Sequence, residues 1–138
     1  MNKLISHITE IKVPFHDVDS ALIVWHGHYV KYLEVARCEL LDTINYNYDD
    51  MIESGYFWPV IDMRLRYAKA SRFGQELLVN STIVEWENRL KINYEIRSAE
   101  SGERLTKANT TQVAVQIETK EMLFESPRVL FEKLGIQQ

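Results

Sequence analysis

A short segment between Phe15 and Tyr29 concentrates side chains that could do chemistry. Its sequence, FHDVDSALIVWHGHY, holds two aspartates and three histidines, with the apolar run Ala21–Trp25 between the acids and the last two histidines. Such groups can transfer protons or bind zinc, and they also occur in ordinary buried turns. Three interpretations follow: a metal site, a catalytic carboxylate that faces a helix end, or a buried turn. No tight pair such as His-x-x-x-His is present, so we expect no metal.

The clearest helix of the chain is predicted where this segment ends. It runs from His28 to about Asn45 without Gly or Pro. Apolar residues recur there in steps of three and four, which predicts one buried face made of Tyr29, Leu33, Ala36, Leu40 and Ile44. A strand is predicted before the segment, from about Leu4 to Phe15, and Pro14 is expected to end it or to place it at an edge.

The rest of the chain mostly alternates with a period of two. After a short helix or turn at about Tyr48–Glu53, strands are predicted at about Ile61–Tyr67, Glu76–Glu87, Ile92–Arg97 and Gln112–Ile117. A short tail helix is expected at about Pro127–Leu134, with Pro127 at its first position. Short turns make these strands antiparallel neighbours, and only the long helix has enough apolar face to cover their sheet. The predicted fold class is therefore α+β: one domain, residues 1–138, with a curved antiparallel five-stranded sheet wrapped around one long central helix.

Composition and charge narrow the classes of function. Hydrophobic residues make up 46% and charged residues 26% of the chain, as in soluble globular proteins. A formal net charge of −4 argues against nucleic acid as the main partner. The single cysteine, Cys38, excludes an internal disulfide scaffold and suits a reducing compartment. We find neither a signal peptide at the N-terminus nor an apolar run near the roughly 20 residues that span a bilayer, so we expect a cytoplasmic protein.

The opening motif resembles one known family. FHDVD at 15–19, followed by small and apolar residues and then WHGHY at 25–29, is similar to the motif of the hot-dog-fold acyl thioesterases. The likeness is to the 4-hydroxybenzoyl-CoA thioesterase family and its Tol-Pal-associated relatives. YLEVAR at 32–37 and RYAKASRFG at 66–74 resemble later family segments, and the element order matches over nearly the whole chain. The resemblance implies a hot-dog fold and hydrolysis of an acyl thioester.

Thioester hydrolysis needs an attacking group and a donor for the developing oxyanion. The chain has no Gly-x-Ser-x-Gly motif and Cys38 falls inside the predicted helix, so a carboxylate must do the work. The resemblance assigns this role to Asp19, as nucleophile or as general base, and Asp17 is the weaker candidate. It also assigns the oxyanion donor to the backbone of His26 or Gly27, where a helix begins with unpaired amides. No metal or cofactor is expected beyond the coenzyme A or phosphopantetheine of the substrate.

Several other residues are candidates for binding the substrate: Trp25, Tyr29, Lys69, Ser71, Arg72, Arg89 and Lys91. Some family members place a basic cluster after the tryptophan of the third strand to hold the nucleotide of coenzyme A. Here Trp86 is followed by Glu87, which would repel phosphate, before Arg89 and Lys91. The carrier could therefore be coenzyme A or an acyl-carrier protein. The chain also departs from the family at Leu22, where glycine is frequent.

Two other functions remain open from the sequence. The hot-dog fold also supports dehydratases, which would need a catalytic histidine paired with an acid from another chain. A non-catalytic protein that binds acyl groups or a carrier protein is the alternative from a different class. In each case a lone sheet would leave exposed edges and an open site, so we expect a homodimer or a homotetramer.

Overall fold

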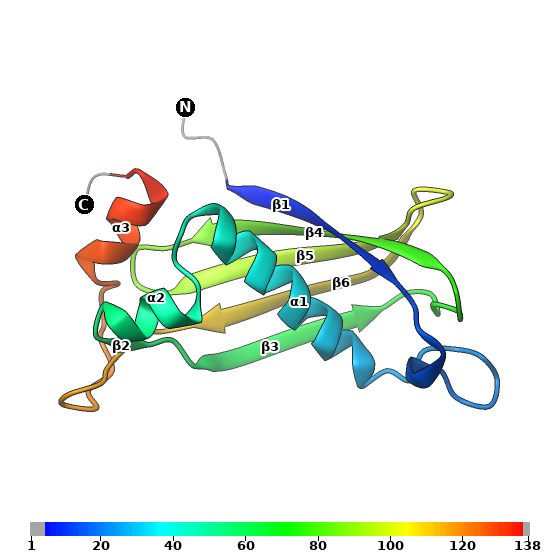
Figure 1. The fold of residues 1–138 in the computed structure, drawn as a ribbon, viewed down its shortest axis with the longest axis horizontal. Helices are drawn as coiled ribbons and strands as arrows, with labels where there is room; N and C mark the ends of the chain where they lie inside the picture. The colour runs from blue at the N-terminus through cyan, green and yellow to red at the C-terminus, as the bar shows by residue number, and fades with distance from the viewer. Residues whose placement is uncertain (1–4, 137–138) are drawn as a thin grey trace.

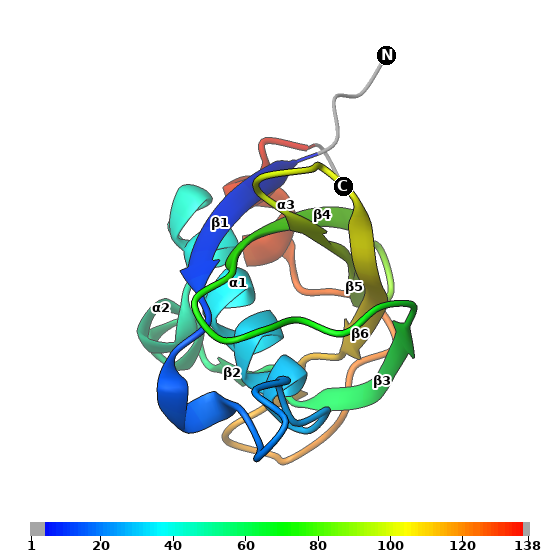
Figure 2. The ribbon, with the colours of Figure 1, turned by 90° about the vertical axis from the view of Figure 1, so that its right-hand side faces the viewer.

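The structure is a computed structural model that describes residues 5–136. A curved sheet surrounds one long helix, α1 (His28–Thr43), which lies across the concave face of the sheet. Figure 2 looks toward one end of the molecule and shows α1 enclosed by the curve of the strands. The predicted arrangement of one helix within a curved antiparallel sheet is confirmed.

The main sheet has five antiparallel strands in the order β1-β4-β5-β6-β3 (Figure 1). Their bounds are β1 Ser6–Lys12, β3 Val60–Tyr67, β4 Glu76–Glu85, β5 Leu90–Ser98 and β6 Arg104–Gln112. Two short strands, β2 (Tyr56–Phe57) and β7 (Val115–Gln116), form a separate two-stranded sheet. Because β1 and β3 are the outer strands, each leaves one row of backbone groups without a neighbour in the sheet.

Three smaller helical elements complete the fold: the 3-10 turn η1 (Phe15–Asp17), α2 (Tyr48–Glu53) and α3 (Arg128–Leu134). Helix α2 begins at a capping box. The side chain of Asn47 accepts a hydrogen bond from the backbone amide of Asp50, and the side chain of Asp50 accepts one from the backbone amide of Asn47. Helix α3 ends at Gly135, whose φ of 71° is the left-handed conformation that favours glycine.

The core lies between α1 and the concave face of the sheet. The predicted apolar face of α1 is confirmed, since all five of its residues are buried: Tyr29, Leu33, Ala36, Leu40 and Ile44. The facing side chains alternate along the central strands, for example Leu77 and Val79 on β4. This packing fixes the position of the first turn of α1 relative to the sheet.

The last strand of the sheet was predicted in the wrong place. The sequence indicated a strand at about Gln112–Ile117, whereas the structure has β6 at Arg104–Gln112 and only the short β7 beyond it. The concave face of β6 carries mostly small or polar side chains, including Thr106, Ala108 and Thr110, all of them buried. Because these residues lack an apolar alternation, the pattern pointed to the next stretch of valines and isoleucine instead.

Other boundaries shifted by a few residues. The first strand ends at Lys12, because the chain turns at Pro14 into η1 and does not stay extended to Phe15. The predicted start of that strand at Leu4 lies outside the described residues. Pro127 caps α3 from an extended conformation and is not its first helical residue. No helix within residues 5–136 is both long and apolar enough to cross a membrane.

Candidate active site

The segment that precedes α1 folds back on itself as a small hairpin. Val18 and Val24 form an isolated antiparallel bridge, and the amide of Asp19 donates to the carbonyl of Ile23 at 2.9 Å. The amide of Trp25 donates to the carbonyl of Asp17 at 3.1 Å. We call residues 18–24 the site hairpin. It carries Asp19, and Asp17 immediately precedes it in η1.

The segment after β3 anchors the site hairpin to the body of the protein. Val24 donates to the carbonyl of Ser71 at 2.9 Å, and Phe73 donates to the carbonyl of Leu22 at 3.1 Å. These contacts leave Leu22 with a φ of 60°, a left-handed conformation that is uncommon for a branched side chain. Leu22 stands where the family often has glycine, so the structure gives a backbone reason for that residue type.

Asp17 is enclosed beneath the first turns of α1. Its side chain has no exposed surface. One carboxylate oxygen accepts from Lys31, and the other accepts from the hydroxyl of Tyr32 at 2.7 Å. The nearest imidazole nitrogens of His16 and His28 lie 3.7 and 3.8 Å away. We call Asp17, Lys31 and Tyr32 the buttress, because together they join the site hairpin to α1.

The surroundings of Asp17 stabilise its charged form. Burial alone would raise the pKa of the carboxyl, but hydrogen bonds from Lys31 and Tyr32 oppose burial, and the net pKa is below its ordinary value. Burial and the hydrogen bond to Asp17 raise the pKa of the Tyr32 hydroxyl, so this hydroxyl keeps its proton. Asp17 is therefore an anion whose oxygens are already occupied by donors.

Asp19 has a different environment. Its residue is exposed, and one carboxylate oxygen accepts from the amide of Ala21 at 2.8 Å and, at 3.4 Å, from that of Ile23. No side-chain donor of residues 5–136 is bonded to this carboxylate. Both backbone contacts lie within the site hairpin. They orient the group and leave its second oxygen open to solvent.

The two residues immediately before α1 have unpaired backbone donors. His28 donates to the carbonyl of Trp25 at 2.9 Å, whereas the amides of His26 and Gly27 have no acceptor within residues 5–136. The indole ring of Trp25 lies directly against Gly27, since an added Cβ there would be 2.1 Å from one ring carbon. Only glycine allows this contact, because any side chain at residue 27 would occupy the space between the backbone and the indole.

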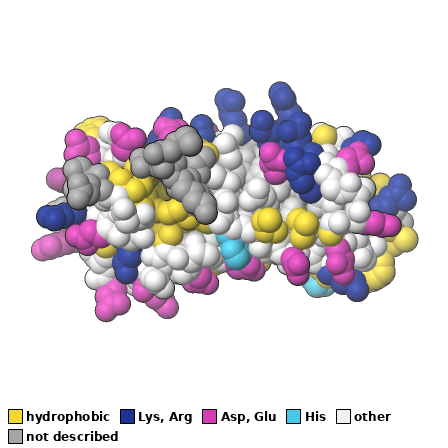
Figure 3. Space-filling model, turned by 90° about the horizontal axis from the view of Figure 1, so that it is seen from above, with side chains coloured by type: hydrophobic (Ala, Val, Ile, Leu, Met, Phe, Trp, Pro, Cys, Tyr) yellow, Lys and Arg dark blue, Asp and Glu magenta, His cyan; other side chains and the backbone are white. Residues whose placement is uncertain are grey.

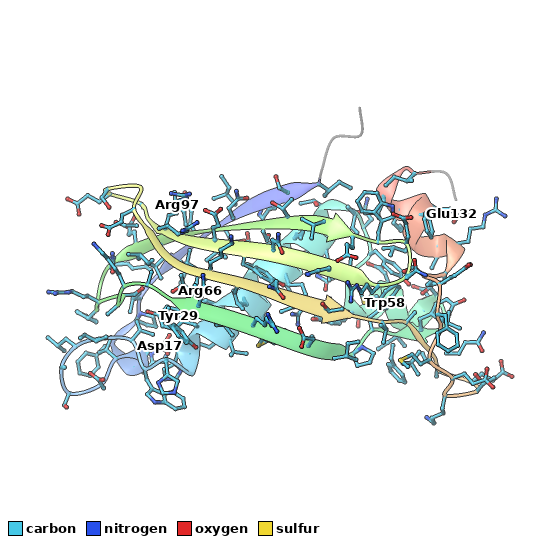
Figure 4. The ribbon with its side chains drawn as sticks, turned by 180° about the vertical axis from the view of Figure 1, so that it is seen from behind. Asp17, Tyr29, Trp58, Arg66, Arg97 and Glu132 are labelled. Carbon is cyan, nitrogen blue, oxygen red and sulfur yellow. The ribbon has the colours of Figure 1, made fainter. Side chains whose placement is uncertain are left out.

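A cavity of about 210 Å³ opens beside His26. It is lined by Val24, His26, Tyr29, Tyr67, Ala68, Lys69 and Ala70. The rings of Tyr29 and Tyr67 lie 5.2 Å apart in it, and the hydroxyl of Tyr67 donates to the carbonyl of His26 at 3.1 Å. Figure 4 shows Asp17 and Tyr29 toward one end of the molecule and Trp58 toward the other. His26 and Tyr29 therefore line the same cavity.

The other predicted binding residues fall into separate groups. Ser71 is fully buried, and its hydroxyl accepts from that of Tyr29 at 3.1 Å, so this side chain holds the cavity wall in place. Lys69 lies at the cavity but is paired with Glu103. Arg72 lines a neighbouring hollow of about 470 Å³. Trp25 is 53% exposed at the start of α1.

Arg89 and Lys91 lie far from this cavity within one chain. They flank the turn between β4 and β5, whereas the site hairpin lies near the opposite end of β4. Ten residues of extended strand separate the two ends by roughly 30 Å. Both cations are also near Glu85, at 3.3 Å from Arg89 and 3.8 Å from Lys91.

Sequence reasoning missed the buttress and Tyr67. It treated Asp17 only as a weaker catalytic candidate, and it gave Lys31 and Tyr32 no role. Lys31 and Tyr32 lie three and four residues after His28 and so share a face of the helix with it, but the spacing does not show that this face lies against Asp17. No group of three or more His, Cys, Asp and Glu residues in the described part of the chain is arranged to hold a metal ion.

Comparisons with known proteins show the family of this chain. The family described as the "Thioesterase-like superfamily" matches residues 13–134. A protein of Synechocystis sp. named "Putative esterase sll0410" is 32% identical over 90% of this chain and 75% of its own. "Putative acyl-CoA thioesterase YneP" of Bacillus subtilis is 29% identical over 80% of each chain.

Solved structures show the same fold. A DHNA-CoA thioesterase from Staphylococcus aureus has 27% sequence identity and a TM-score of 0.78, over 86% of this chain and 80% of its own. More distant thioesterase structures share the architecture. The resemblance drawn from the opening motif is therefore confirmed. The chain belongs to the thioesterase-like superfamily, has the hot-dog fold and is an enzyme of the thioesterase class.

Proposed function

We propose that the protein hydrolyses an acyl thioester, carried on coenzyme A or on phosphopantetheine, to a free acid and a thiol. Asp19 supplies the attacking group, and the amides of His26 and Gly27 polarise the thioester carbonyl. The reaction needs no metal and no cofactor apart from the carrier of the substrate. The observation that carries this proposal is the pair of unpaired backbone amides at His26 and Gly27, together with the 210 Å³ cavity that His26 lines.

The backbone immediately before α1 is suited to stabilise an oxyanion. Amides at a helix start carry partial positive charge, and here the His26 and Gly27 amides have no competing acceptor within residues 5–136. Charge that develops on the thioester oxygen would be stabilised there, and one such donor typically lowers the barrier by about 2.7–4 kcal/mol. The cavity beside His26 offers room for the carbonyl and the first part of the acyl group.

The exposure of Asp19 supports its role as the attacking group. As a base, its carboxylate takes a proton from water while the water oxygen bonds to the thioester carbon. As a nucleophile, it bonds to that carbon itself and forms an anhydride that water then hydrolyses. In both routes the carbon–sulfur bond breaks and the thiolate leaves with the carrier. Asp17 is unsuited to either role, since Lys31 and Tyr32 occupy its oxygens.

We further propose that two copies pair through β3. Every residue of β3 is at least partly exposed, including Val60 and Ile61, which are 36% and 55% exposed. An open edge with apolar side chains is normally covered, and a two-fold pairing of β3 strands would join two sheets into one. Antiparallel pairing would also bring the end of one chain where β3 begins, at Val60, toward the cavity of the other chain.

Hydrolysis across a panel of substrates tests the proposed activity. The panel holds aromatic and aliphatic acyl groups, each on coenzyme A and on an acyl-carrier protein, and release of the free thiol is measured. We expect turnover with at least one acyl group and no loss after a chelator is added. Binding without turnover across the whole panel would contradict the proposal and favour a non-catalytic binding protein.

A further inference from the structure

Tyr67 joins the end of the sheet to the backbone just before α1. It is the last residue of β3, and its hydroxyl donates to the carbonyl of His26 at 3.1 Å. Its ring also lies edge to face with the imidazole of His26, with the ring centroids 6.3 Å apart. The attack and the polarisation described above make no use of these contacts.

Two sets of contacts hold Tyr67 in place. On the strand side, the amides of Ala68 and Lys69 both donate to the carbonyl of Leu105, at 2.9 and 3.0 Å, and so fix the end of β3 on β6. On the helix side, the ring of Tyr67 lies 5.2 Å from the ring of Tyr29, which is buried on α1. The phenol is therefore positioned before any substrate binds.

The hydrogen bond from Tyr67 reaches a peptide whose other end is the proposed oxyanion donor. The carbonyl of His26 and the amide of Gly27 belong to one peptide unit, and its bond is trans. In a trans peptide the C=O and the N–H point in opposite directions. The hydroxyl of Tyr67 therefore restrains the plane of this peptide and directs the Gly27 amide away from the phenol.

The same hydrogen bond makes the Gly27 amide a stronger donor. A donor at the carbonyl polarises the whole peptide unit, and hydrogen bonds linked in this way strengthen one another by roughly 10–30% each. The carbonyl of His26 also accepts from the amide of Tyr29, at a longer distance of 3.4 Å. Burial and the neighbouring Tyr29 raise the pKa of the Tyr67 hydroxyl, so this hydroxyl keeps the proton that it donates.

Water reaches this hydrogen bond in the free chain. Tyr67 is 46% exposed, and other hydrophobic side chains are exposed at the end of the molecule that carries the site hairpin (Figure 3, right), among them Trp25. Because Tyr67 lines the cavity beside His26, an acyl group in that cavity would displace water from the phenol. A hydrogen bond is electrostatically stronger where water is excluded, so we expect its effect to grow when substrate binds.

We propose that Tyr67 is a positioning residue for thioester hydrolysis. Its hydroxyl holds and polarises the peptide between His26 and Gly27, and the amide of Gly27 then binds the developing oxyanion. This inference rests on the proposed thioesterase function. It gives a task to a residue at the end of the sheet, outside the motif that precedes α1.

Tyr67→Phe removes the hydroxyl and keeps the ring that packs on Tyr29. The matched control is Tyr56→Phe, which removes a hydroxyl from β2 at the other end of the molecule (Figure 1). With an acyl thioester that wild type hydrolyses, we expect kcat of Tyr67→Phe to fall about tenfold and KM to stay within about twofold, because the contact acts on the transition state. Tyr56→Phe should keep the wild-type kcat, and thermal unfolding shows whether all three proteins are equally folded.

The hydrogen bond itself can be measured in the free protein. The ¹⁵N chemical shift of an amide responds to polarisation of its peptide unit by a donor at the carbonyl. The chain has 5 glycines, so protein labelled with ¹⁵N-glycine gives few signals, and the signal of Gly27 is identified by its loss in Gly27→Ala. In Tyr67→Phe we expect the Gly27 signal to move upfield and the signals of the other glycines to stay in place. Tyr56→Phe should leave the Gly27 signal unchanged.

These two measurements separate the inference from the proposed function. An unchanged Gly27 signal in Tyr67→Phe, or equal kcat in Tyr67→Phe and wild type, would overturn the inference and leave hydrolysis intact. A raised KM with unchanged kcat would also overturn it, because Tyr67 would then act on substrate binding. If wild type hydrolyses no thioester, the proposed function fails and the positioning role fails with it, whatever the Gly27 signal shows.

Discussion

The buttress and the site hairpin place two carboxylates, only two residues apart, in opposite environments. Asp17 in the buttress is fully buried and bonded to Lys31 and Tyr32, whereas Asp19 in the site hairpin is exposed and bonded only to backbone amides. A carboxylate enclosed by donors stabilises structure, because any reaction at its oxygens would first break those bonds. An exposed carboxylate that is oriented by its own loop can meet a substrate.

This contrast predicts that substitutions of Asp17 and Asp19 have different effects. Substitution in the buttress should mainly lower the free energy of unfolding and have less effect on kcat. Substitution in the site hairpin should mainly lower kcat and have less effect on the free energy of unfolding.

Asp19→Asn should abolish most turnover. The amide keeps the size of the side chain and can still accept from Ala21, but it cannot act as base or nucleophile. We expect kcat to fall about 1,000-fold, within the usual range for loss of a catalytic base, with little change in melting temperature. Steady-state kinetics and thermal unfolding of the same preparation check this. A variant that keeps a tenth of wild-type kcat would remove Asp19 from the chemistry.

Gly27→Ala should reduce kcat by displacing Trp25. The new methyl group would lie 2.1 Å from the indole ring, so the ring or the first turn of α1 must move. We expect a loss of about 100-fold, comparable to the loss of one oxyanion donor. The matched control is the same change in a Trp25→Ala protein, where no ring obstructs the methyl group. An equal loss in both backgrounds would show that the indole contact is not the cause.

Asp17→Asn should mainly lower stability. The neutral amide cannot form the ion pair with Lys31, which is itself 46% exposed, so solvent screens part of the effect. We expect the free energy of unfolding to fall by about 2 kcal/mol, measured by denaturant titration. Because the pKa of Asp17 is lowered in the folded protein, its stabilising effect is complete above its unfolded pKa of about 3.9.

The pH dependence of that difference tests the buttress further. As the pH falls below about 4 and through the folded pKa, wild type loses the contribution of the Asp17 anion and Asp17→Asn has none to lose. The gap in unfolding free energy between the two proteins should therefore shrink on acidification from pH 5. A gap that stays constant down to pH 2 would show that the charge of Asp17 does not stabilise the fold.

Changes at Leu22 should have the smallest effect. Leu22→Gly and Leu22→Ala both remove a side chain that is 51% exposed, but only glycine is relaxed at a φ of 60°. We expect the glycine variant to exceed the alanine variant by about 1 kcal/mol in unfolding free energy. If alanine is the more stable of the two, the left-handed conformation of the site hairpin is incorrect.

The sequence predicted the long helix and most strands because their apolar periodicity is strong. It misplaced β6, where buried threonines and an alanine face α1 in place of larger apolar residues. The role of Asp17 could not be predicted either. Two aspartates separated by one residue look equivalent in sequence, and only the 3-10 turn at Phe15–Asp17 brings the first of them under Tyr32.

The same limit applies to the cations. Sequence reasoning treated Arg89 and Lys91 as binding residues, yet the strand pairing places them at the other end of β4 from the site hairpin.

A crystal structure of the Asp19→Asn variant with an uncleaved acyl-CoA is the most direct measurement of the central claim. We predict that the thioester oxygen lies about 2.7–3.1 Å from the backbone nitrogen of His26 or Gly27, with residue 19 of one subunit facing the thioester carbon. A thioester bound with its carbonyl away from both amides, or with Asp17 as the nearest carboxylate to that carbon, would contradict the claim.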